Sequence, residues 1–229
     1  MKKFILIFIS LFAAYTTVSA QSFKKDIFGI RAGINSASFV ESADAIGINI
    51  SMETDSRISF HVGFLYQRLL IPTVPLYLET GLYFTEKGFK QSLVYTSFIP
   101  VYPPNDIDIY AHSKINVNAM YLKVPLLLNY HFILANNITI QPFAGFYLAY
   151  GIGGKMKFTD YSSDKKSANT FSDNGLDRLD LGVRLGVGAT FDRIYIGAGY
   201  EPGLINVSDS GEDSTTKTKN WAFTIGYTF

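Results

Sequence analysis

The last nine residues, 221–229, alternate between apolar and polar side chains and end on an aromatic residue. Successive side chains of an extended strand point to opposite faces, so one face would carry Trp221, Phe223, Ile225, Tyr227 and Phe229. A soluble strand can alternate in this way, but a chain that ends on such a strand is typical of outer-membrane barrels, whose assembly machinery reads it. We therefore expect Trp221, Phe223, Tyr227 and Phe229 to form an assembly signal and the barrel assembly machinery to be a partner.

The first 20 residues have the pattern of a cleaved secretory signal peptide. Lys2 and Lys3 precede an apolar run over 4–14, and small residues lead up to Ala20. The run is too short to span a membrane. Export through this segment would leave 21–229 as one domain, an outer-membrane β-barrel domain.

Charge and cysteine content exclude several classes of partner. Removing the two lysines of the signal segment from the 20 basic residues leaves 18 against 19 acidic ones, so the exported chain is close to neutral. This balance gives no reason to expect nucleic acid. The chain has no cysteine, which excludes disulfides and thiol-bound metals.

Period-two alternation bounded by turn residues predicts eight strands. They are placed at 26–36, 57–68, 76–90, 115–132, 138–154, 178–191, 194–205 and 219–229. No helical period competes over a comparable length. The expected fold is all-β, a single eight-stranded antiparallel up-and-down transmembrane barrel, with both termini at one end because the strand count is even.

The lengths of the connections support this fold. Three are short, at 69–75, 133–137 and 192–193. Four are long, at 37–56, 91–114, 155–177 and 206–218. Short turns therefore fall at one end of the sheet and long loops at the other, as in bacterial outer-membrane barrels with periplasmic turns and extracellular loops.

The two faces of the strands differ in polarity. The apolar face falls on even-numbered residues in most strands and on odd-numbered ones in 178–191, and its aromatic residues sort into two levels, as expected at two membrane interfaces. The opposite face carries a polar set: Arg31, His61, Glu79, Lys87, Lys123, Asp180, Arg184 and Glu201. Side chains fill the interior of an eight-stranded barrel, and buried charges need partners. We therefore expect the acids Glu79, Asp180 and Glu201 to neutralise some of the four basic residues, giving a filled lumen.

Two passages resemble a known family. The segment 79–88, ETGLYFTEKG, and the segment 121–130, YLKVPLLLNY, resemble the PorT-like outer-membrane β-barrel domain of Bacteroidetes. This resemblance implies a small outer-membrane barrel without a catalytic motif. Some relatives take part in a protein secretion system, so a component of a secretion or envelope complex is an alternative function.

Candidate chemistry is sparse. His61 and Glu79 fall on lumenal faces of neighbouring strands, which permits an acid–base or metal site, but a buried ion-pair network is favoured. A lipid-modifying outer-membrane enzyme would need a histidine near the outer rim and a nucleophile; His61 is placed suitably, and no serine motif accompanies it. The acids Asp209, Glu212 and Asp213 match no calcium loop. We expect no catalysis, no cofactor and no metal.

The loop 91–114 is unusually apolar for a segment facing water. Its aromatic residues include Tyr95, Phe98, Tyr102 and Tyr110. They could form a contact surface for a protein partner, and projecting strand edges could add a partner strand. The favoured alternative is a hairpin that continues its two strands and covers the barrel mouth.

Together these features predict a monomeric protein of the outer membrane, in contact with its lipid, with a structural or surface-interaction role. Alternatives are the secretion or envelope component, a narrow channel and the lipid-modifying enzyme. A soluble lipocalin-type barrel would instead place the apolar face inside.

Overall fold

The computed structural model describes residues 23–45, 48–99, 107–135, 137–159, 165–172, 175–208 and 214–229. The predicted signal segment 1–20 lies outside this part. The eight long strands are β1 (Asp26–Ala45), β3 (Asp55–Ile71), β4 (Val74–Ile99), β5 (Ile107–Tyr130), β7 (Ile138–Thr159), β9 (Leu179–Phe191), β10 (Ile194–Pro202) and β11 (Ser214–Thr228). The three short ones are β2 (Ile48–Glu53), β6 (Phe132–Ala135) and β8 (Lys165–Asn169). In the described ranges, no helix is long and apolar enough to cross a membrane.

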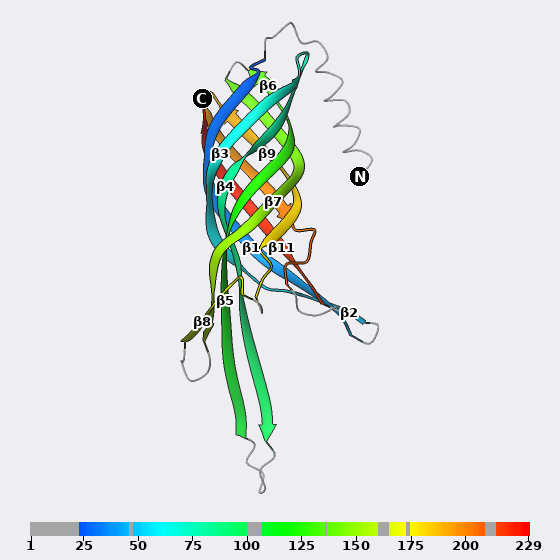
Figure 1. The fold of residues 1–229 in the computed structure, drawn as a ribbon, viewed down its shortest axis with the longest axis vertical. Helices are drawn as coiled ribbons and strands as arrows, with labels where there is room; N and C mark the ends of the chain where they lie inside the picture. The colour runs from blue at the N-terminus through cyan, green and yellow to red at the C-terminus, as the bar shows by residue number, and fades with distance from the viewer. Residues whose placement is uncertain are drawn as a thin grey trace.

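The long strands form a closed ring (Figure 1). Each pairs antiparallel with its neighbour in chain order, and β11 returns to pair with β1 from Gly29 opposite Thr228 to Ala43 opposite Ser214. Closure leaves no free edge in the ring. The predicted fold, an all-β up-and-down barrel of eight strands, is confirmed.

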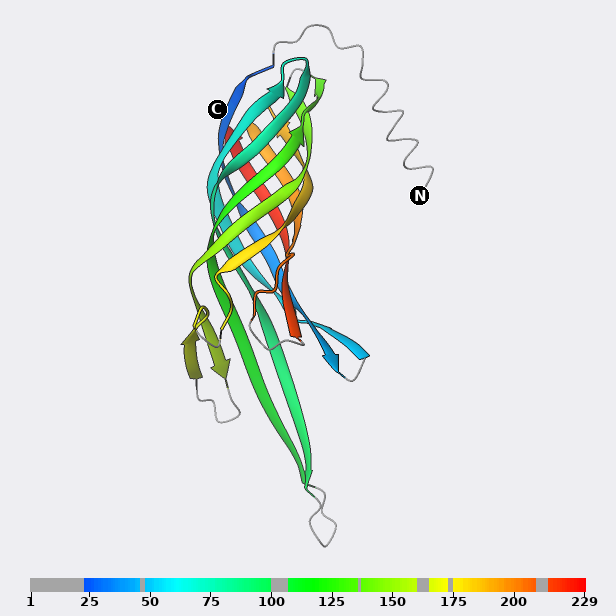
Figure 2. The same cartoon turned by 45° about the vertical axis from the view of Figure 1, so that its right-hand side comes forward.

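The two ends of the ring differ as the connections predicted. One end, called the turn end here, holds the tight connections, including Asp192-Arg193 between β9 and β10. Asp192 has φ of 56°, the left-handed region that Asp tolerates better than most residues. The final residue also lies there, because the Phe229 amide donates to the carbonyl of Phe28 at 2.9 Å. The opposite end, called the loop end, lies toward the bottom of Figures 1 and 2.

At the loop end the strands are longer than predicted. β4 and β5 stay paired out to Ile99 opposite Ile107, so much of the predicted loop 91–114 is a two-stranded ribbon. Apolar–polar alternation could not reveal this ribbon. Beyond the ring, the two faces of a strand no longer face a lumen on one side and the outside of the barrel on the other, so no alternation is required. The ribbon continues along the strand direction in Figure 2. It is therefore the predicted hairpin, but it does not fold over the barrel mouth as expected.

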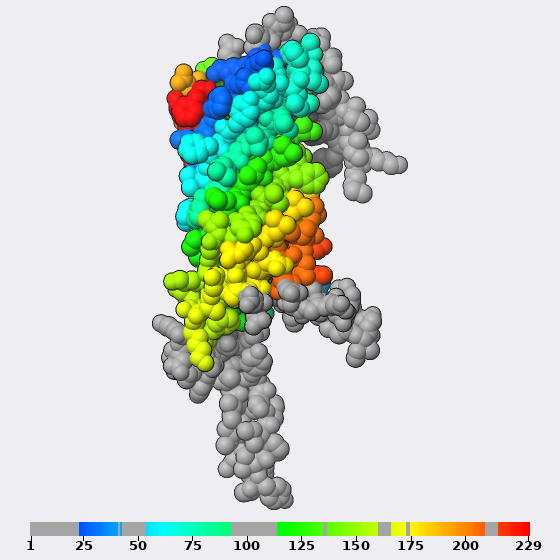
Figure 3. All heavy atoms as spheres, in the orientation of Figure 1, coloured from blue at the N-terminus to red at the C-terminus, as the bar shows by residue number. Residues whose placement is uncertain are grey.

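The outer face is apolar and the interior is polar. Phe64 and Leu126 point outward with 71% and 54% of their surface exposed, whereas Lys123 and Asp180 point inward with 1% and 0%. This arrangement excludes the lipocalin alternative, which needs the reverse. The strands lie tightly side by side on the face shown in Figure 3.

Outward aromatic residues pair within each of the two predicted levels. Near the turn end, the ring centroids of Phe28 and Tyr66 lie 5.0 Å apart. Toward the loop end, those of Tyr200 and Trp221 lie 4.8 Å apart. Cross-strand pairs of this kind stabilise neighbouring strands and leave an aliphatic band between the two levels.

Candidate functional site

The lumen near the turn end contains neutral polar contacts around one carboxylate. Glu79 Oε2 accepts hydrogen bonds from Gln67 Nε2 at 2.8 Å and Asn129 Nδ2 at 2.7 Å. Beyond it, the rings of Tyr77 and His131 stack with centroids 4.2 Å apart. Glu79 makes no ion pair with another described residue. The expectation that it would neutralise a lumenal cation is therefore wrong: two amides hold it instead.

Arg31 also lacks a carboxylate among the described residues. Its guanidinium donates to the carbonyl of Tyr227 and the hydroxyl of Thr228, both at 3.2 Å, and lies 4.1 Å from the ring centroid of Tyr195. Carbonyl dipoles and a ring face both favour a cation. Arg31 thereby joins β1 to the closing strand β11.

Glu201 forms the central ion-pair cluster. One oxygen, Oε1, accepts from Lys123 Nζ at 2.6 Å and from Arg184 Nη1 at 2.8 Å, while Oε2 accepts from Asn220 Nδ2 at 2.9 Å. All four side chains are buried. One carboxylate thus holds together β5, β9, β10 and β11 across the lumen.

A second buried ion pair lies nearer the loop end. Lys87 Nζ is 2.8 Å from Asp180 Oδ2, and both side chains have no exposed surface. The hydroxyls of Tyr147 and Thr218 surround the carboxylate at 3.3–3.4 Å, and Lys87 Nζ lies 4.4 Å from the Tyr147 ring centroid. Every polar atom of this pair is thereby satisfied in the interior, which a buried charge requires.

His61 is held between two polar side chains. Its Nδ1 lies 2.9 Å from Asn35 Oδ1 and its Nε2 lies 3.0 Å from Thr224 Oγ1. His61 pairs with Thr85 on β4, whereas Glu79 pairs with Gln67. The two residues are therefore separated by about 20 Å along the sheet, at roughly 3.4 Å per residue, and do not form the acid–base pair that the sequence allowed.

An apolar plug, not expected from the sequence, closes the loop end of the lumen. It consists of Phe39, Phe89, Val117, Ala119, Tyr121, Tyr147, Ala149, Phe171, Leu176 and Val207. Loop residues enter it because their backbone is anchored: Leu176 N donates to Thr170 O at 2.7 Å and Asp177 N to Val207 O at 2.8 Å. A Cβ at Gly151 would collide with the Phe171 ring. The glycine run at 151–154 and isolated apolar residues in polar loops were the only sequence signals for the plug.

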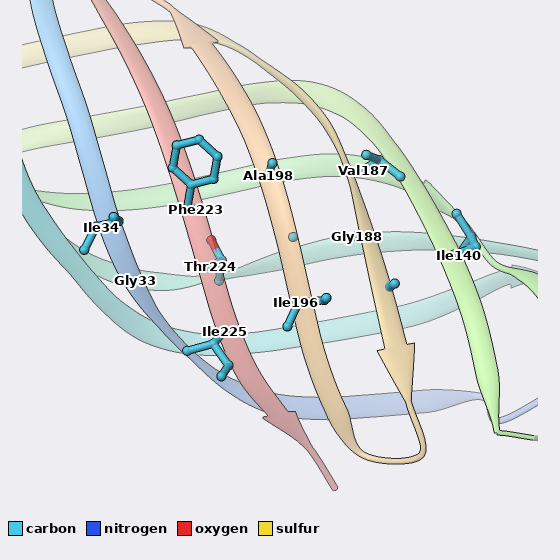
Figure 4. A pocket seen from close by; sticks show the side chains of 12 residues that line it. Gly33, Ile34, Ile140, Val187, Gly188, Ile196, Ala198, Phe223, Thr224 and Ile225 are labelled. Carbon is cyan, nitrogen blue, oxygen red and sulfur yellow. The ribbon is translucent and has the colours of Figure 1, made fainter.

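The outer face carries a shallow apolar depression over β1, β7, β9, β10 and β11 (Figure 4). Its volume is about 720 Å³. Ala198 lies between larger side chains, including Ile196, Val187 and Phe223, and leaves the hollow (Figure 4). An apolar, open hollow of this kind suits hydrocarbon, and the hydroxyl of Thr224 in its lining already contacts His61 Nε2 at 3.0 Å.

One ion pair lies on the surface of the turn end. Asp26 Oδ1 accepts from the Tyr66 hydroxyl and from Arg68 Nη1, both at 2.8 Å. The hydrogen bond from Tyr66, then that from Arg68, holds the pKa of Asp26 below its ordinary value. The same carboxylate raises the pKa of Arg68.

The remaining predicted residues have these positions. Trp221, Phe223 and Phe229 are exposed on the outer face, and the Tyr227 hydroxyl accepts from Arg193 at 3.1 Å. Tyr95, Phe98 and Tyr110 belong to the ribbon, but their side chains lie outside the described part, as do Tyr102, Asp209, Glu212 and Asp213. No three His, Cys, Asp or Glu residues in the described ranges cluster as a metal site.

Residues 19–209 match a family described as outer membrane protein beta-barrel domain. The chain belongs to this family. The match places the barrel in the outer membrane and is broader than the PorT-like resemblance, which stays a prediction. No curated protein matches the sequence.

Solved structures of other small barrels are similar to this one in fold. Ail, the attachment invasion locus protein of Yersinia pestis, has 15% identity over 90% of this chain and 100% of its own, with a TM-score of 0.42. Neisserial surface protein A has 12% identity over 88% and 97%, with a TM-score of 0.44. OprG from Pseudomonas aeruginosa has 15% identity over 92% and 99%, with a TM-score of 0.39.

Proposed function

We propose that this protein is a non-catalytic, integral barrel of the outer membrane that presents the β4–β5 ribbon outside the cell for contact with another protein. The ring serves as a rigid anchor in lipid, and the turn end faces the periplasm. The lumen is filled by ion pairs and by the apolar plug, which argues against a channel.

The ribbon is the observation that carries this proposal. β3 pairs with β4 only up to Lys90, and β7 pairs with β5 only from Lys114 onward. Among the described residues, Leu93–Ile99 and Ile107–Ser113 therefore pair only with each other. Each strand keeps an open edge of roughly 25 Å, at about 3.3 Å per residue. Open edges can accept an added strand from a partner.

The contacts of the candidate catalytic residues support a role without catalysis. His61 is buried, and each ring nitrogen already has a partner. The carboxylates of Asp180 and Glu201 are likewise committed to buried cations. A nucleophile–base pair open to substrate is absent from the described lumen. In the part of the chain that the structure describes, no specific contact favours the secretion-complex alternative over a free-standing barrel.

Two experiments test the proposal. The full chain should fractionate with outer membranes and migrate faster unheated than heated on a gel; recovery as a soluble periplasmic protein would contradict the barrel assignment. For the ribbon, a photo-crosslinking residue at Thr96 or Ile109 in intact cells should yield protein adducts. The matched control at Leu126, on the lipid face, should yield none.

A variant without the ribbon tests whether the barrel folds independently of it. Replacing 93–113 with an Asn-Gly turn joins Ser92 to Lys114 where the ring ends and should leave the gel shift unchanged. If intact cells give no adduct at either ribbon position, the contact role is wrong while the barrel assignment stands.

A further inference from the structure

Five lysines gather on the outside of the loop end, away from the lumen and from the tip of the ribbon. They are Lys90 of β4, Lys114 of β5, Lys155 and Lys157 of β7, and Lys166 of β8. All five are exposed, and none forms an ion pair with a described residue. We call this set the lysine surface.

Strand pairing brings these lysines together. Lys90 pairs with Asn116, and Asn116 pairs in turn with Lys157. Two lysines therefore flank one asparagine, with backbones about 10 Å apart, since neighbouring strands lie about 4.8 Å apart. Lys114 is the next outward-facing residue of β5 after Asn116 in the direction of the loop end. A groove of about 630 Å³ runs between them and is lined by Lys90, Lys114, Lys157 and Lys166.

A bulge in β7 turns two of the lysines outward. Tyr121 pairs with Gly151 but Met120 pairs with Gly153, so Ile152 is an extra residue in β7. Before the bulge, even-numbered residues such as Tyr150 face out. After it, Lys155 and Lys157 face out. Bulges re-aim side chains in this way. Without this one, alternation would direct both ammonium groups toward the apolar plug.

The groove has an excess of positive charge. Asp55 is the single carboxylate residue that lines it, against four lysines. A second hollow beside it, about 320 Å³ in volume, contains Arg57, Lys155 and Lys157. There Glu86 pairs with Arg57 at 2.7 Å, so its carboxylate does not neutralise Lys155 or Lys157. Nearby like charges repel one another, and an anion in the groove would relieve this repulsion.

The lysine surface directly continues the lipid-facing wall. Phe84, Leu122 and Tyr150 pair in one outward row, and Leu122 and Tyr150 are exposed. Lys155 and Lys157 follow on the same side, about 10–15 Å further out given the rise and tilt of barrel strands. Lysine side chains can reach back several ångströms toward headgroups. The hydrocarbon chains of one lipid would thus contact the apolar wall while its anionic headgroup contacts the lysine surface beside that wall.

We propose that the lysine surface binds phosphate groups on the headgroups of lipids in the leaflet at the loop end. The proposal depends on the outer-membrane placement of the barrel and not on any partner of the ribbon. Ammonium groups pair strongly with phosphate as point charges. A phosphorylated glycolipid suits the height of the groove, because its headgroup extends beyond the glycerol level of ordinary phospholipids.

The test compares two charge-matched variants of the full chain in detergent micelles. Lys90→Gln with Lys157→Gln removes the pair flanking Asn116. Lys24→Gln with Lys25→Gln removes two exposed lysines at the turn end. The probes are phosphorylated lipid A and the same lipid after removal of its phosphates, with bound lipid counted by native mass spectrometry. Gel mobility before heating reports that each variant is folded.

The unmodified protein should bind phosphorylated lipid A about tenfold tighter than the dephosphorylated form. The Lys90/Lys157 variant should lose about tenfold, the Lys24/Lys25 variant should lose nothing, and binding should weaken at high salt. Equal affinity for both lipids, or equal loss in both variants, would overturn the proposal. Displacement by free tripolyphosphate at equal concentration would also overturn it, because the groove would then recognise soluble phosphate.

Discussion

The two faces of β5 show opposite chemistry on alternate residues. Lys123 points inward with 1% of its surface exposed, and its near neighbour Leu126 points outward with 54% exposed. In a soluble protein lysine is almost never fully buried, and leucine usually is. The difference indicates that the surroundings, and not the residue type alone, decide which face is the core: the lumen holds its charges in pairs, and we expect lipid to cover the leucines.

The two faces also differ in how specific their contacts are. Inside, Glu201 is matched to Lys123, Arg184 and Asn220 by individual hydrogen bonds. Outside, Ile34, Phe223 and the residues around Ala198 share only their apolar character, and the depression among them needs no single partner. Stability should therefore fall when a single hydrogen-bonding or charged group is removed from the interior. On the exterior, it should fall when an apolar side chain is replaced by a polar or charged one.

Among the substitutions that test this comparison, Glu201→Gln should cause the largest loss in the free energy of unfolding. The substitution keeps the shape but leaves Lys123 and Arg184 without their carboxylate, and breaking a buried ion pair costs about 3–5 kcal/mol. Urea unfolding of the protein in lipid vesicles, followed by the gel mobility shift, would measure the loss.

A double variant separates charge from packing. Glu201→Gln combined with Lys123→Met removes one unpaired cation and should recover part of the stability lost in the single variant. If both variants unfold at the same urea concentration, the cluster is not held by charge pairing.

Leu126→Arg tests the outer face and should cost about 2–4 kcal/mol if the residue faces the middle of the lipid layer. Leu126→Phe is the control, because it keeps the side chain apolar, and it should change the free energy of unfolding little. A neutral result for the arginine variant would show that the outward face of β5 does not contact hydrocarbon.

The sequence predicted the two faces better than it predicted the contacts within the lumen. Alternation assigns a side to each residue, so the inward positions of Lys87, Asp180 and Glu201 followed directly from it. It does not give the heights at which side chains from tilted strands meet. Glu79 could therefore be expected to reach a cation, whereas it lies among Gln67 and Asn129.

The loop end was predicted least well, for a related physical reason. Phe171 and Val207 enter the plug from two distant loops, which the hydrogen bond from Asp177 N to Val207 O joins, and no periodic pattern records such contacts. The bulge at Ile152 reverses the faces of β7, so simple alternation assigns Lys155 and Lys157 to the wrong side.

The smallest effect should come from the ion pair on the surface of the turn end, which is the exposed counterpart of the Glu201 cluster. Asp26 and Arg68 lie in water, where ion pairs contribute little. Because the folded state lowers the pKa of Asp26, any stabilisation is present above the ordinary pKa of 3.8 and is lost as the pH falls below it. Asp26→Asn should therefore shift urea unfolding slightly at pH 7 and less at pH 2. A shift at pH 7 as large as that of Glu201→Gln would mean that burial does not set the strength of these pairs.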